Sequence, residues 1–166
     1  YYDAVISWFS RRHHWKPRRE WFIYTSGVVP ALSAVIKALT NVGDKVLTLT
    51  PVYNCFFSSI RNNGCELDSS ALRYENNTFS IDYEDLERRA ADPKTTLMLL
   101  CNPHNPSGRV WTREELRRIG DICIKNNVVV VADEIHCELV HPGFTYTPFA
   151  SVSEEFQKHS VTCVAP

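Results

Sequence analysis

Two stretches decide the expected fold: TLMLLCNPHNPSG at residues 96–108 and VVVVADEIH at residues 128–136. In each stretch a run of apolar, β-favouring residues ends abruptly at an amide or carboxylate side chain. Continuous apolar runs are typical of parallel strands that are buried on both faces. Polar side chains just past such strands lie where open α/β sheets bind their ligands. We therefore expect a ligand site built from the segment 102–108 and from Asp133.

The rest of the chain alternates between helical and strand-like patterns. Apolar residues recur at helical spacing over 3–15, 29–41, 53–63, 82–91 and 112–127. Further strands are expected over 22–25, 45–50 and 160–164, and residues 65–72 and 79–81 are weaker strand or loop segments. Proline and glycine indicate a surface loop over 138–150. This alternation predicts an α/β fold with three layers, α/β/α, around a mainly parallel sheet.

Composition excludes several classes of function. The chain has 166 residues and is 44% hydrophobic and 22% charged, which is ordinary for a globular protein. Its net charge of −1 gives no electrostatic argument for binding to nucleic acid or to a membrane surface. Six cysteines without a C-x-x-C pair give little support to a zinc site or a disulfide framework. With no signal peptide and no apolar stretch near 18 residues, we expect a cytoplasmic protein.

Both ends of the sequence look like cuts through a larger protein. The chain begins at Tyr1, directly in a helical pattern, and stops at Pro166, after an expected strand. We therefore expect residues 1–166 to be one partial domain, truncated at both ends.

The motif N-P-x-N-P-x-G at residues 102–108 is the most specific signal in the sequence. Its five fixed positions arise by chance in a chain of this length with a probability on the order of 10⁻⁴ or less. The two prolines stiffen the loop and Gly108 permits a positive φ, so Asn105 becomes a fixed side-chain donor above the sheet. A turn-rich loop capped by its own asparagines is the structural alternative.

Three other parts of the sequence suit different groups of a ligand. Asp133 follows a buried strand, where its carboxylate needs a partner such as a protonated heterocyclic nitrogen; an arginine or a helix N-terminus would serve equally. Gly27, Val28 and Val29 lie between a strand and a helix, where free N–H groups bind phosphate, although glycine turns are common at such junctions. Tyr53 could stack on a planar ring or simply belong to the core.

Together these motifs resemble a known family. The segments SGVVP (26–30), PVY (51–53), NPHNPSG (102–108) and DEIH (133–136) resemble, in order and spacing, the pyridoxal-phosphate enzymes of fold type I. The match lies in the class I/II aminotransferase superfamily and covers nearly the whole chain. G-V-V-P and D-E-I-H look most like its cystathionine β-lyase branch of C–S lyases, since typical aminotransferases have Tyr where His136 stands.

The resemblance implies a role for each motif in binding pyridoxal 5′-phosphate. The implied cofactor-binding residues are Gly27, Val28 and Val29 at the phosphate, Tyr53 on the ring, Asn105 at the 3′-oxygen, Asp133 at the pyridinium nitrogen, and His136 near the 3′-oxygen. The Schiff-base lysine is implied just after Pro166, so no catalytic residue is expected within the chain. The small C-terminal domain is likewise expected beyond it.

The implied activity of the full-length protein is α,β-elimination from a sulfur amino acid, which yields a thiol, pyruvate and ammonia. Two alternatives remain open: an aminotransferase, and a non-catalytic module that binds cofactor or dimerises. The resemblance also implies a homodimer acting on a small amino-acid substrate. The isolated 166 residues are expected to be inactive.

Overall fold

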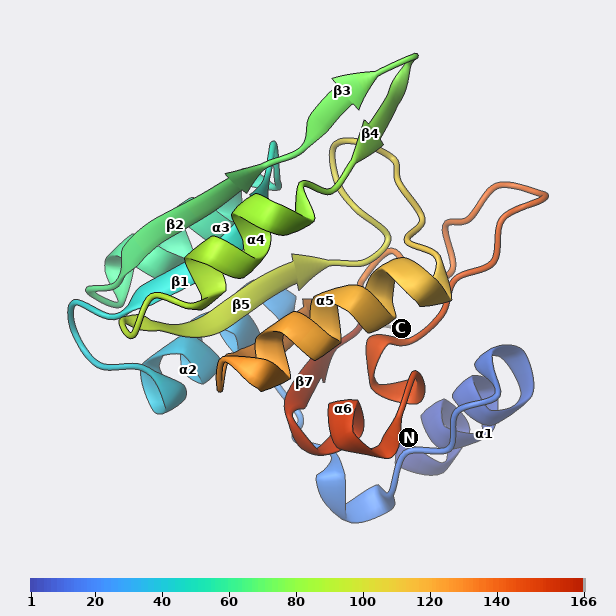
Figure 1. Ribbon diagram of the computed structural model, residues 1–166. Helices are drawn as coiled ribbons and strands as arrows, with labels where there is room; N and C mark the ends of the chain where they lie inside the picture. Colours follow the sequence, from blue (N-terminus) through green and yellow to red (C-terminus); the bar gives the residue numbers. More distant parts are fainter. Residues whose placement is uncertain (166) are drawn as a thin grey trace.

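The computed structural model describes residues 1–165, and its centre is a sheet of parallel strands (Figure 1). The strands are ordered β2-β1-β5-β6-β7 across the sheet. Their bounds are β1 Lys45–Thr50, β2 Glu66–Ala71, β5 Thr95–Cys101, β6 Val129–Asp133 and β7 Ser160–Cys163. Each neighbouring pair is parallel. The expected α/β fold with a mainly parallel sheet is therefore confirmed.

Helices and one small hairpin make up most of the remaining structure. The α-helices are α1 Tyr2–His13, α2 Val28–Leu39, α3 Asn54–Asn62, α4 Tyr83–Ala90, α5 Arg113–Lys125 and α6 Glu154–Lys158. The short 3₁₀ helices are η1 Arg19–Trp21 and η2 Phe149–Ser151. The weak segment at 79–81 belongs to an antiparallel hairpin, β3 Arg73–Glu75 with β4 Thr78–Ser80, which projects from the sheet (Figure 1).

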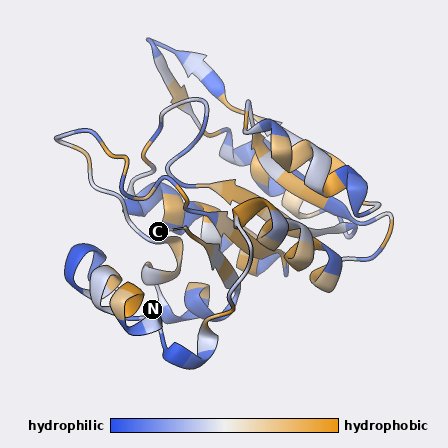
Figure 2. Cartoon of the chain, turned by 180° about the vertical axis from the view of Figure 1, so that it is seen from behind, coloured by the Kyte–Doolittle hydropathy of each residue, from blue (hydrophilic) through white to orange (hydrophobic). Residues whose placement is uncertain are grey.

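The sheet is covered on both faces, as the continuous apolar strands require. Helices α2 and α3 pack on one face, and α4 and α5 pack on the other (Figure 1). Successive strand residues alternate between the two cores: Val46, Leu97, Leu99 and Val131 pack with α2 and α3, whereas Leu47, Met98, Leu100 and Val130 pack with α4 and α5. Both sides of each central strand are thus apolar, which is why the strands lie in the most hydrophobic part of the ribbon (Figure 2).

Helix starts follow the capping signals in the sequence. Thr112 accepts a hydrogen bond from the N–H of Glu115, and the Glu115 carboxylate accepts one from the N–H of Thr112, which forms the expected capping box of α5. Asp82 caps α4 by accepting from the N–H of Asp85. These local bonds fix where α4 and α5 begin.

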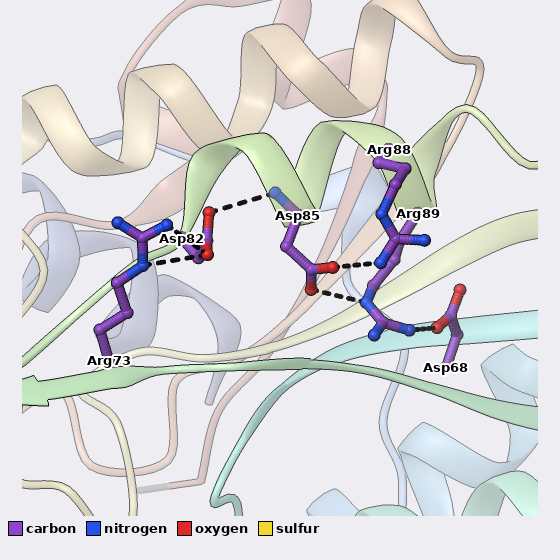
Figure 3. Close-up of polar contacts among 6 residues, drawn as sticks. All are labelled: Asp68, Arg73, Asp82, Asp85, Arg88 and Arg89. Atoms are coloured by element: carbon purple, nitrogen blue, oxygen red, sulfur yellow. Dashed lines mark hydrogen bonds and ion pairs between the residues drawn. The ribbon is translucent and has the colours of Figure 1, made fainter.

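Ion pairs hold α4 against the strands beneath it (Figure 3). Arg89 lies between Asp85, at 2.6 Å, and Asp68 of β2, while Arg73 of β3 holds Asp82. Burial raises the pKa of Asp85, but hydrogen bonds from Arg89 and its other neighbours outweigh it and bring that pKa to about 2. Three acidic and three basic side chains balance in this network (Figure 3), which gives it a structural role.

Two sequence-based expectations were wrong. Residues 22–25 form no strand: the segment lies outside the sheet, and Ile23 and Tyr24 are 87% and 73% exposed. An extended segment without a neighbouring strand has no partner for its backbone groups, so local β propensity alone does not make it a strand. The segment 138–150 is only partly a surface loop, because Tyr146 and Phe149 are buried.

Helix α1 packs against the segment that follows β6. Its Phe9 forms a small apolar cluster with Cys137 and Tyr146. Glu138 accepts a hydrogen bond from Trp8 Nε1 at 2.5 Å and pairs with His13 at 2.7 Å. The segment after β6 is thereby fixed from the side of α1.

Candidate functional site

The carboxyl edge of the sheet contains a topological switch point between β1 and β5. From β1 the chain moves outward to β2, and then returns to the other side of β1 to form β5, β6 and β7. The loops that leave β1 and β5 therefore diverge, and in open α/β sheets ligands bind in the crevice that such loops form. Tyr53 follows β1 and Asn105 follows β5, so the fold brings these two predicted site residues to the same edge; both are half-buried.

Asp133 is the last residue of β6, at the centre of this edge. It lies in register with Cys101 of β5 and Cys163 of β7, and strand alternation puts it on the same face as Val131, which packs with α2. Asp133 is 3% exposed, and its carboxylate accepts a hydrogen bond from the N–H of Ile135 at 3.2 Å. Within residues 1–165, Asp133 takes part in no ion pair with a lysine or an arginine.

This environment suits a cationic ligand group. Burial raises the pKa of Asp133, and the Ile135 N–H and the charge of His136 offset this only in part. Burial also raises the pKa of the Cys101 and Cys163 thiols to about 12, so neither carries charge near neutral pH. A cationic group of a ligand beside Asp133 would offset the free energy needed to keep this buried carboxylate ionised. The alternative that an arginine of this chain serves as the partner does not hold in the described residues.

The N-terminus of α2 reaches the same edge on the same face. Helix α2 ends shortly before β1 begins, so its last turn lies near the amino end of that strand. Its 12 residues span about 18 Å, close to the length of a six-residue strand. The first turn of α2 therefore lies near the carboxyl ends of the strands. Gly27 is the N-cap with φ 153°, and no side chain caps the helix. The N–H groups of Val28 and Val29 precede the first intrahelical bond, from Ala31 to Gly27, so they are open to an anion.

The side chains of Val28 and Val29 behave differently from each other. Val28 is buried in the α2 core, whereas Val29 is 37% exposed. Any contact of Val28 with a ligand therefore comes from its backbone. The structure does not test the roles of Gly27, Val28 and Val29, which stay predictions.

Tyr53 and His136 lie close enough to Asp133 to interact with it electrostatically. The neighbouring Cys55 thiol, and more weakly the Asp133 carboxylate, raise the pKa of the Tyr53 phenol. Tyr53 is the N-cap of α3, so it lies in the short segment between β1 and that helix. The ring of His136 makes no hydrogen bond within residues 1–165, although its charge lowers the pKa of Asp133.

A buried polar cluster beneath the site was missed by sequence reasoning. Glu134 is fully buried and accepts hydrogen bonds from Asn102 Nδ2 at 2.9 Å, from the N–H of Phe149 at 2.8 Å and from the hydroxyl of Tyr146. Burial raises the pKa of Glu134 to about 7, and the three donors only partly oppose this. The positions of Glu134 and Asn102 just after neighbouring strands could have suggested that they lie close together. Nothing in the sequence around Tyr146 indicates that it joins them.

His104 is a buried histidine with a hydrogen bond, as a lone histidine beside a polar motif usually is. The residue is 2% exposed, and its Nε2 lies 2.9 Å from the carbonyl oxygen of Pro51. It thus joins the loop after β5 to the loop after β1. The sequence did not predict this partner, because Pro51 lies 53 residues away.

Two further findings concern the cysteines and the helices of the described residues. All six cysteines are free. No helix within residues 1–165 has both the length and the apolar character needed to cross a membrane. The lysine expected after Pro166 lies outside the described residues.

Comparison with known proteins agrees with this geometry. Cystathionine β-lyase PatB of Bacillus subtilis is 46% identical over 164 residues, which cover 99% of this chain and 42% of PatB. Cystalysin of Treponema denticola, whose structure contains pyridoxal 5′-phosphate, superposes with a TM-score of 0.97 at 37% identity, covering 99% of this chain and 42% of cystalysin. Human kynurenine–oxoglutarate transaminase 3 is 32% identical over 137 residues, covering 78% of this chain and 30% of the transaminase.

The chain spans 42% of the length of PatB and of cystalysin and 30% of that of the transaminase. Residues 2–165 match the family described as aminotransferase class I and II. The match covers nearly the whole sequence and agrees with the parallel sheet and its switch point. The chain therefore belongs to the class I and II aminotransferase family.

Proposed function

We propose that this chain is the cofactor-holding part of a pyridoxal-phosphate-dependent carbon–sulfur β-lyase. The observation that carries the proposal is Asp133, a buried carboxylate without a cationic partner in the described residues, on the sheet face that packs against α2. The lyase name of PatB supports the choice of reaction.

The donor set fits pyridoxal 5′-phosphate. Open N–H groups and the positive end of the α2 dipole suit a dianionic phosphate. The carboxylate of Asp133 suits a protonated ring nitrogen, and Asn105 supplies a side-chain donor for the ring oxygen. Tyr53 supplies an aromatic face for the ring. When bound, the cofactor supplies the electron sink for the reaction at the amino-acid substrate.

Asp133 would hold a proton on the ring nitrogen. Because water is largely excluded from its carboxylate, the attraction to a positive partner is strong there. We expect the pKa of Asp133 to fall when the cofactor binds, since the partner replaces lost hydration. The covalent lysine is expected from the segment after Pro166.

The aminotransferase remains the second candidate. The human transaminase supports it, and the residues present in the chain serve elimination and transamination equally. The D-E-I-H segment at 133–136 favours the lyase. We expect a cytoplasmic homodimer that acts on a small amino acid; a non-catalytic binding module is the third possibility.

The test uses the full-length protein that carries this sequence. Asp133→Asn should weaken pyridoxal-phosphate binding about 10- to 100-fold, the range for loss of a charged hydrogen bond. Asp121→Asn, an exposed α5 carboxylate paired with Arg117, is the matched control and should leave the affinity unchanged. Equal affinity in the Asp133 variant and the wild type would contradict the proposed role of Asp133.

The reaction class is read from the products. A lyase should release pyruvate from cystathionine without a 2-oxo acid acceptor. An aminotransferase should release none and should instead transfer the amino group to such an acceptor. Cofactor binding without either reaction would favour the non-catalytic module.

A further inference from the structure

The loops after β1 and β5 are no longer joined by strand pairing where the site begins. The ladder between the two strands ends at the pair Thr48 and Leu99. Beyond it, β1 pairs with β2 up to Ala71, and β5 pairs with β6 up to Asp133. At the switch point, something other than the sheet must set how far apart the two loops lie.

The imidazole of His104 crosses this gap. It contacts the Pro51 carbonyl oxygen through Nε2 at 2.9 Å, across 53 residues of sequence. A carbonyl can only accept, so Nε2 carries the proton and donates. Burial lowers the pKa of His104, so the neutral ring with hydrogen on Nε2 is the form present near neutral pH. Its Nδ1 is buried and has no hydrogen-bond partner in the described chain.

His104 is itself held rigidly. Its backbone N–H donates to the carbonyl of Arg109 at 2.7 Å, and its carbonyl accepts from the N–H of Gly108 at 2.8 Å. Its ring packs edge-on against Trp111 at 5.3 Å between ring centres. Trp111 in turn donates from Nε1 to the carbonyl of Cys101 at 3.0 Å. The imidazole of His104 is therefore held in a fixed orientation on the loop after β5.

The two residues joined by this hydrogen bond, His104 and Pro51, are close in sequence to two site residues. Pro51 precedes Tyr53 by two positions, and His104 directly precedes Asn105. The N–H of Asn105 also donates to the Cys101 sulfur at 3.3 Å, which ties Asn105 to the end of β5. A shift of the β1 loop relative to the β5 loop would thus change the position of Tyr53 relative to Asn105.

We propose that His104 is a positioning residue whose Nε2–H bond to Pro51 sets the separation between Tyr53 and Asn105 for a flat ligand. The inference rests on the proposed function, in which Tyr53 contacts the face of the pyridoxal-phosphate ring and Asn105 contacts its 3′-oxygen. His104 itself touches no reacting atom in this account.

The test compares two amide substitutions in the full-length protein. In His104→Gln the amide nitrogen can occupy the place of Nε2 and donate to Pro51, whereas in His104→Asn it reaches only the place of Nδ1. The dissociation constant for pyridoxal phosphate should rise at least tenfold in His104→Asn and less than threefold in His104→Gln. His141→Asn, at an exposed histidine, is the control and should change nothing.

Thermal unfolding without cofactor separates positioning from folding. Both His104 variants lose the Trp111 contact, so a merely structural role predicts equal losses in melting temperature and in affinity. Equal affinities in the two variants would overturn the inference. Failure of the wild type to bind pyridoxal phosphate would instead overturn the proposed function.

A measurement on the unsubstituted protein covers the case in which a variant does not fold. The ¹⁵N NMR shifts of the His104 ring should show hydrogen on Nε2 and a bare Nδ1. The opposite tautomer would overturn the inference, because Nε2 could then not donate to Pro51.

Discussion

Glu134→Gln should remove a pH dependence from the stability of the protein. Glu134 is fully buried and accepts from Asn102, Phe149 and Tyr146. Two of these donors, Asn102 and the N–H of Phe149, share Oε1, while Tyr146 binds Oε2. A glutamine can keep its carbonyl oxygen at the Oε1 position and donate from its amide to the Tyr146 oxygen, so it resembles the protonated glutamate.

The expected magnitude follows from the pKa of Glu134, which burial raises from the ordinary 4.5 to about 7. At about 1.4 kcal/mol per pKa unit, this corresponds to about 3 kcal/mol. Because the folded state binds the proton more tightly than the unfolded state, this contribution is fully present below pH 4.5. It is lost as the pH rises through about 7.

The assay is urea unfolding of the 166-residue chain, followed by tryptophan fluorescence, at intervals from pH 5 to pH 8. The unfolding free energy of Glu134→Gln, relative to the wild type, should rise by about 2.5 kcal/mol across this range, because part of the contribution is already lost at pH 5. Glu114→Gln is the control. Its pKa is lowered by the hydrogen bond from Arg117, which stays charged throughout this pH range. Its difference from the wild type should therefore stay flat above pH 5. Parallel curves for Glu134→Gln and the wild type would show that burial does not raise the pKa of Glu134 in the folded chain.

Two further substitutions test packing and capping. A Cβ added at Gly120 would lie 2.2 Å from ring atoms of Phe156, so Gly120→Ala should destabilise the fold by about 1–3 kcal/mol. Adding Phe156→Leu should recover part of that loss, and additive effects in the double variant would speak against a clash. Thr112→Ala should cost about 1 kcal/mol by removing the capping box with Glu115, whereas Thr112→Ser should cost little. Chemical unfolding measures these variants and Phe156→Leu alone, and an unchanged Thr112→Ala would show that the cap does not stabilise α5.

Much of the fold could be predicted from local patterns. The apolar run before Asn102 and the valines before Asp133 specify buried strands, because only strands covered on both faces tolerate such continuous apolar sequence. Thr112 and Glu115 specify the start of α5, since both partners of a capping box lie within four residues. The segment 22–25 shows the limit of this approach. Its β propensity is real, but no strand lies beside it.

Some features of the candidate site could likewise be predicted from the sequence, and others could not. The α/β class, the strand-end positions of Asn105 and Asp133, and the family resemblance could be predicted from the sequence, because each depends on residues that are neighbours in the chain. Three features became visible only in the folded chain: Asp133 pairs with no lysine or arginine of the described residues, Glu134 binds Tyr146, and His104 joins the β1 loop. These contacts join segments that are distant in sequence, such as Pro51 and His104. Burial and electrostatics there depend on which segments the sheet order brings together, and periodicity along the chain does not record that order.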